Sequence, residues 1–177
     1  MQFDNYKKIL PQKEPFMFID GVTHFNKESK LLIAHKKFKN DEYFLRGHFP
    51  NDPLVPGVIL IEAMSQSCIL CGFYSNDAPL DDVSSFEHLV FGVKVKFRNK
   101  CFPEKEIELR SELIDVLQNV SIFKVKAIDT ENNNIVASGE IKGVAKYKGS
   151  AEDLRRRQKN FSNHEQVSEH RRNGRTA

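Results

Sequence analysis

Apolar and polar positions alternate along much of this chain. From Glu106 to Leu113 apolar or small side chains lie between charged ones, and the segment 93–98 alternates in the same way. A two-residue period predicts a β-strand with one buried face. Further β-rich runs are found at 16–22, 30–38, 120–128 and 135–147, and Glu131-Asn132-Asn133-Asn134 predicts a turn between the last two.

The segment 58–73 breaks this alternation. It contains no proline and little charge, and its apolar side chains would cover nearly every face of a helix. Such a helix is expected inside a core. Pro53 and Pro56 exclude a helix through the preceding loop, and Pro56 suits a helix start. At about 16 residues interrupted by polar groups, the segment is too short for a membrane span, and no other stretch is long enough to cross a membrane.

One long apolar helix within a run of antiparallel strands predicts an α+β fold, with an antiparallel sheet wrapped around a central helix. The 177 residues suit one domain. We assign it to residues 1–148, followed by a charged tail at 149–177 that is flexible or partly helical. The tail holds seven basic and four acidic residues, which accounts for the net charge of +3. A contact of this tail with an acidic partner stays open, whereas no basic–aromatic pattern supports nucleic-acid binding.

The cysteines and the amino terminus argue against a disulfide-stabilised, a metal-binding or a secreted protein. Three cysteines do not make a disulfide framework. Cys68 and Cys71 have the spacing of a metal-binding pair but lie in the predicted helix without a second pair, so we interpret them as packing residues and expect no metal. Residues 1–8 have no apolar signal core, and a cytoplasmic location is therefore expected.

Two residues are candidates for chemistry. Glu62 is a single carboxylate in the apolar helix, and burying an unpaired charge costs several kcal/mol or forces neutralisation. A chain that keeps such an acid is a candidate for acid–base catalysis. Gln66 follows four residues later, where its amide can hydrogen-bond the Glu62 carboxyl. His48 lies in a loop bounded by glycine and proline, and histidine can act as a base near neutral pH.

The residues around this pair resemble a known family. Gly47-His48-Phe49-Pro50, then Pro53 and Pro56-Gly57-Val58, then Glu62-Ala63-Met64 with Gln66, are similar to the β-hydroxyacyl-[acyl carrier protein] dehydratases of fatty acid synthesis. The resemblance covers roughly residues 8 to 147. It implies the hotdog fold, a reaction without metal or organic cofactor, acyl carrier protein as partner, and a homodimer with composite active sites. Higher homo-oligomers stay open, and no membrane or nucleic-acid partner is expected.

The resemblance also implies roles. His48 would remove the C2 proton of a 3-hydroxyacyl thioester, and Glu62 would protonate the departing C3 hydroxyl. The Gly57 N–H, at a helix start, would hold the thioester carbonyl, and Gln66 would support the acid. Their spacing does not show that His48 and Glu62 meet within one chain. Basic residues that would help to dock the acidic carrier protein are Arg46, Lys96, Arg98 and Lys100.

Two departures from the family leave the substrate open. The usual His-Arg after Leu10-Pro11 is replaced by Gln12-Lys13, and the usual Gly-Asp after Pro103 by Glu104-Lys105. The pathway is therefore open between fatty acids, polyketides, aryl polyenes and related lipids, as are acyl chain length and isomerase activity. Two alternatives are a hotdog acyl thioesterase and a non-catalytic acyl-carrier-binding subunit. Three other histidines are interpreted as surface or packing residues: His24, His35 and His88.

Overall fold

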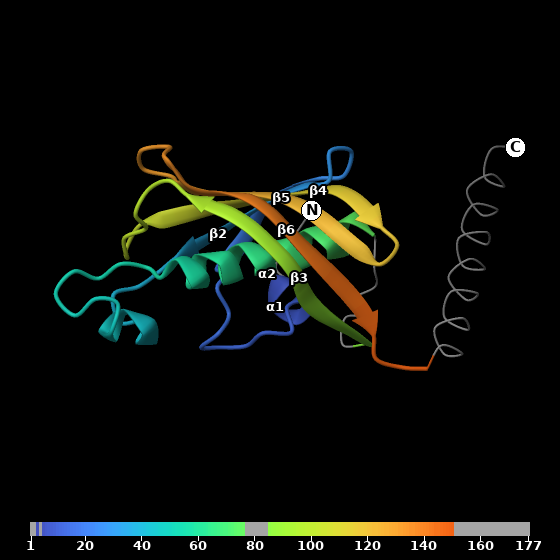
Figure 1. Ribbon diagram of the computed structural model, residues 1–177, viewed down its shortest axis with the longest axis horizontal. Helices are drawn as coiled ribbons and strands as arrows, with labels where there is room; N and C mark the ends of the chain where they lie inside the picture. The colour runs from blue at the N-terminus through green and yellow to red at the C-terminus, as the bar shows by residue number, and fades with distance from the viewer. Residues whose placement is uncertain (1–2, 4, 77–84, 151–177) are drawn as a thin grey trace, which may run out of the picture.

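A curved antiparallel sheet wraps around one long helix (Figure 1). The computed structural model describes residues 3, 5–76 and 85–150, so most of the predicted tail lies outside the described residues. The strand order in the six-stranded sheet is β1-β2-β4-β5-β6-β3, and every pair is antiparallel. This confirms the predicted α+β class. The elements are α1 (Tyr6–Ile9), β1 (Gly21–Asn26), β2 (Leu31–Lys37), η1 (Tyr43–Arg46), α2 (Gly57–Ser75), β3 (Phe86–Phe97), β4 (Glu106–Leu117), β5 (Val120–Asp129) and β6 (Ile135–Tyr147).

The central helix α2 begins after Pro56, as predicted, and buries side chains on several faces, including Leu60, Met64 and Leu70. It has 19 residues, so the expectation of a helix too short to span a membrane was wrong in its length. Among the described residues it is the one helix whose length and composition would permit a span. Half of its most apolar window is nevertheless buried within the fold.

Strand β4 carries the predicted alternation. Ile107, Leu109 and Leu113 are buried and join the core around α2. Ser111 has the same orientation and is also fully buried, and its hydroxyl contacts the Ser67 hydroxyl of α2. These two buried hydroxyls, one from the helix and one from the sheet, therefore satisfy one another.

The cysteines also lie where packing residues are expected. Cys68, Cys71 and Cys101 are buried free thiols. Burial raises the pKa of Cys71 to about 11 and that of Cys101 to about 12, and it raises the pKa of Cys68 further still. All three thiols are therefore neutral at neutral pH, which is typical of packing residues.

The predicted strand at 16–22 was wrong over most of its length. Strand β1 begins only at Gly21 and continues to Asn26. Met17, Phe18 and Ile19 are buried, which explains the β-rich pattern, but they pack against the helix without joining the sheet. The backbone of this segment hydrogen-bonds a helix side chain, Gln66, and this bonding replaces a strand partner.

Strand β3 differs from its prediction in length and burial. It extends over 12 residues, and its apolar side chains at Val93 and Phe97 are 43% and 52% exposed, although the alternation predicted a buried face. The reason is its position: in the described part of the chain, β3 is an edge strand that pairs only with β6. Further exposed apolar residues on the same strand are Leu89, Val90 and Phe91.

Gly139 permits the close approach of β6 to β3. A Cβ at this position would overlap the Lys94 carbonyl oxygen and lie 2.8 Å from the Val95 Cα. Because backbone atoms cannot move aside cheaply, Gly139→Ala should destabilise the fold by about 1–3 kcal/mol. Urea unfolding monitored by circular dichroism would measure this loss. Gly92→Ala is the control, since a Cβ at Gly92 meets no atom within 4 Å; equal losses in the two variants would contradict the argument.

Candidate active site

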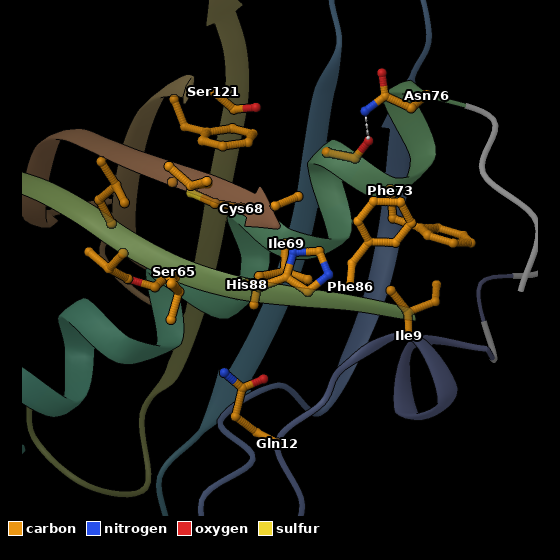
Figure 2. Close-up of a pocket in the computed structure, with 18 of the residues that line it drawn as sticks. Ile9, Gln12, Ser65, Cys68, Ile69, Phe73, Asn76, Phe86, His88 and Ser121 are labelled. Carbon is orange, nitrogen blue, oxygen red and sulfur yellow. Dashed lines mark hydrogen bonds between the residues drawn. The ribbon is translucent and has the colours of Figure 1, made fainter. Parts of the chain in front are cut away.

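A cavity of about 420 Å³ lies between α2 and the sheet (Figure 2). One face of the helix lines it from Glu62 in the second turn to Asn76 at the C-cap. The opposite wall comes from the start of β3 and the end of β6, and Gln12 closes one side. The lining is mainly apolar, with few polar groups, as expected for a site that receives an organic ligand.

The Glu62 carboxyl is half-buried in this cavity and is held by two amides. Gln66 Nε2 donates to Glu62 Oε1 at 2.9 Å, which confirms the predicted contact along the helix. Gln12 Nε2 donates to the same oxygen at 3.3 Å. Both donors converge on Oε1, so the carboxyl orientation is fixed while Oε2 is free of both amides. The sequence did not predict the contact with Gln12, because it joins residues 50 positions apart.

Gln66 is completely buried and connects three parts of the site. Its amide oxygen accepts a hydrogen bond of 2.7 Å from the Phe18 N–H, and its Nε2 donates to the Phe16 carbonyl at 2.8 Å as well as to Glu62. One side chain therefore attaches the amino-terminal segment to α2 and orients the candidate acid.

His48 lies in a closed loop just after η1. The Leu54 N–H donates to the His48 carbonyl at 2.9 Å, and His48 Nδ1 lies 2.8 Å from the Leu54 carbonyl. A carbonyl oxygen can only accept a hydrogen bond, so Nδ1 carries the proton. The neutral imidazole then has its lone pair on Nε2, where it can act as a base.

Aromatic packing positions this loop. Phe44 of η1 contacts Phe18 and Phe38 in a core cluster, with ring centroids 6.1 Å apart in both pairs. Beyond the loop, the Val55 N–H donates to the Cys101 carbonyl at 2.9 Å. The loop is thus fixed at both ends while the half-buried His48 stays accessible.

Gly57 is the first residue of α2. Its N–H is one of the four at a helix start that have no acceptor within the helix, and no acceptor for it is found in the described part of the chain. The Phe97 ring approaches the glycine so closely that a Cβ there would lie 2.7 Å from the ring. An unpaired N–H with partial positive charge therefore stands beside an edge-strand aromatic ring.

The structure brings only part of the predicted site together in one chain. Glu62 and Gln12 line the cavity, and Gln66 lies directly behind them, whereas His48 and Gly57 are not in its wall. No group of three or more His, Cys, Asp or Glu side chains within the described ranges could hold a metal ion. The four candidate docking residues, Arg46, Lys96, Arg98 and Lys100, are all exposed.

His88 is a site residue that the sequence analysis missed. It was interpreted as a surface or packing histidine, but it is half-buried on β3 and lines the cavity. Burial, and secondarily the charge of Lys148, lowers the pKa of His88 below its usual value. The sequence pattern did not predict this. His88 is followed by three consecutive apolar residues, Leu89, Val90 and Phe91, and all three are exposed, so the pattern does not show which face of the strand is internal.

Comparison with known proteins identifies the family. The model of the FabA-like domain matches residues 10–140. This chain belongs to the FabA-like domain family. The predicted resemblance to hotdog-fold dehydratases is thereby confirmed at the level of the family, and the sheet around a central helix is the hotdog fold.

Solved structures agree with the fold of this FabA-like domain. The dehydratase heterocomplex ApeI:P from Xenorhabdus doucetiae matches with a TM-score of 0.63 and 14% identity, over 85% of this chain and 95% of that one. The HP0420 homologue from Helicobacter felis matches with a TM-score of 0.59 and 12% identity, over 84% and 93%. The fluoroacetyl-CoA thioesterase FlK has a TM-score of 0.54 and 15% identity, over 73% and 95%. At these identities the likeness establishes the fold and leaves the reaction open.

The buried amide of Gln66 generates a stability prediction. Gln66→Leu leaves the buried Phe18 N–H without its acceptor, which should lower the free energy of unfolding by about 1–3 kcal/mol. Thermal or urea unfolding would measure the change. Gln12→Leu is the control, because Gln12 is only half-buried and makes a single long hydrogen bond. A loss for Gln12→Leu as large as for Gln66→Leu would show that burial of the amide is unimportant.

Proposed function

We propose that this protein dehydrates 3-hydroxyacyl groups, carried as thioesters on acyl carrier protein, to trans-2-enoyl groups. His48 Nε2 takes a proton from C2, and the electron pair of that C–H bond forms the C2–C3 double bond. The C3–O bond breaks as the hydroxyl receives a proton from Glu62 and leaves as water. The Gly57 N–H stabilises the negative charge that develops on the thioester carbonyl.

The observation that carries the proposal is the hydrogen bond between His48 Nδ1 and the Leu54 carbonyl. Before substrate arrives, this bond fixes the tautomer whose Nε2 is free to accept a proton. Glu62 complements it, because two amides hold its Oε1 and leave the other oxygen to carry the proton. A positioned base and a positioned acid are the two groups that elimination of water requires.

A homodimer would complete the site. Among the described residues, one edge of strand β3 has no strand partner, and Val90, Phe91 and Phe97 on this strand are more than half exposed. Such an edge favours pairing with a second chain. We propose that two copies pair along β3, so that His48 of the partner subunit faces Glu62. The dehydratase ApeI:P is a heterocomplex, which supports assembly of such domains in pairs.

The carrier protein would approach beside this dimer edge. Lys96 lies near the end of β3, Arg98 and Lys100 follow it, and Arg46 ends η1, so their exposed charges are available to an acidic partner. Arg98 is also held in place, since its Nε donates to Ser138 Oγ at 3.1 Å. Complementary charge of this kind mainly accelerates encounter and fixes orientation.

An acyl thioesterase is the second candidate. FlK, a thioesterase, has a similar fold, and a half-buried carboxylate beside a cavity can also activate water for attack on a thioester carbonyl. Dehydration uses both His48 and Glu62 as they are held here, and we therefore prefer it. The two reactions give different products, an enoyl thioester or a free thiol.

Substitution of the proposed acid and base tests the reaction. His48→Ala and Glu62→Gln should each lower kcat about a hundred- to ten-thousand-fold, because each removes a proton-transfer group. Mass spectrometry of the 3-hydroxyacyl-carrier substrate would show loss of one water with the wild-type protein. His24→Ala, on an exposed face of β1, is the control. Release of free carrier thiol, or near wild-type turnover by either variant, would overturn the assignment.

Mixed dimers test whether the site is composite. If the site is shared between subunits, a heterodimer of one His48→Ala chain and one Glu62→Gln chain contains one intact site and one site that lacks both groups. Such heterodimers, purified with two different tags, should then regain about half of the wild-type turnover per dimer. If each chain held a complete site, no activity would return. Each homodimeric variant, treated in the same way, is the control.

A further inference from the structure

The cavity contains a histidine that the proposed reaction does not use. His88 is the third residue of β3, on the wall that faces α2 (Figure 2). None of the hydrogen bonds found within the described residues involves its ring nitrogens. Two other polar side chains of the lining are already engaged: Ser65 Oγ donates to the Ile61 carbonyl at 2.8 Å, and Asn76 Nδ2 donates to the Gly72 carbonyl at 2.8 Å.

His88 and Glu62 line the same cavity at different positions along α2. Phe97, at the other end of β3, lies against Gly57 at the start of α2, and nine residues of strand separate it from His88. Ile69, which lines the same cavity as His88, is seven residues, or about 10 Å of helix, beyond Glu62. An acyl group whose thioester end reacts near Glu62 would therefore bring its distal part to His88.

The imidazole at this position is neutral. Its pKa lies below the usual range because the ring is withdrawn from water, so near neutral pH it carries one N–H donor and one nitrogen acceptor. A hydroxyl group matches such a ring, because it can donate to one nitrogen or accept from the other. A saturated alkyl end would displace water from both nitrogens without replacing any hydrogen bond, which is unfavourable.

We propose that His88 makes this cavity selective for acyl groups that carry a hydroxyl at their distal end, in preference to saturated chains of the same length. This inference deepens the proposed function, on which it rests for the acyl thioester as ligand. His88 is a specificity-determining residue in this view and takes no part in the transfer of protons at C2 and C3.

Binding of a matched pair of acyl pantetheine thioesters tests the inference. The two have the same chain length, and one ends in a methyl group while the other ends in a primary hydroxyl. Lengths are varied in steps that bring the end past Ile69. With the wild-type protein, calorimetry should show tighter binding of the hydroxyl-ended ligand at its best length, by about five- to tenfold for one hydrogen bond.

Variants at position 88 separate hydrogen bonding from packing. His88→Leu should abolish or reverse the preference, and His88→Gln should retain most of it because an amide also donates and accepts. His24→Leu on β1 should leave the ratio unchanged. A wild-type preference for the methyl-ended ligand, equal binding of the pair, or an unchanged ratio in His88→Leu would overturn the inference.

Turnover, measured in parallel with the 3-hydroxy forms of both ligands, distinguishes failure of the inference from failure of the proposed function. A protein that binds with the expected preference but releases no water would overturn the dehydratase proposal and leave the role of His88 supported. A dehydratase with no preference between the two chain ends would do the reverse.

Discussion

The site depends on the buried side chain of Gln66. Its amide hydrogen-bonds Phe18 and Phe16 of the amino-terminal segment and Glu62 of its own helix. An amide offers both donors and an acceptor, so one side chain can satisfy backbone groups that cannot join the sheet and still orient a carboxyl. Phe18 in turn packs on Phe44, which leads into the loop of His48. The proposed acid and the loop of the proposed base thus share one support.

In the proposed dimer, the described chain would be half of the assembly. Its cavity contains Glu62, but His48 lies outside its wall, and the apolar strand β3 has a strand partner on one side only within the described residues. A second copy on that edge would bury the exposed side chains and supply the missing base. The stability of the dimer and the completeness of the site would then have one physical origin, the burial of apolar surface along β3.

The alternation of apolar and polar residues predicted a strand correctly where its apolar face packs against the core of the same domain. The alternation at Ile107, Leu109 and Leu113 identified β4, because one face meets the core and the other meets solvent. It failed for 16–20, where burial against the helix gives a strand-like composition without strand partners. It also failed for the burial of β3, because alternation shows that two faces differ and does not show what covers the apolar one.

The sequence by itself determined the fold class, the central helix and the chemical types at His48, Glu62 and Gln66, because these follow from local periodicity, loop-forming residues and an i, i+4 spacing. The cytoplasmic location and the extent of the tail stay predictions of the sequence. Only the tertiary structure decided that Gln12 contacts Glu62, that His48 has its proton on Nδ1, and that His88 faces a cavity. The Gln12 contact and the cavity wall join segments far apart along the chain, and the His48 contact depends on how a six-residue loop folds back on itself. Such proximity is set by the folded structure, and no periodicity of the sequence encodes it.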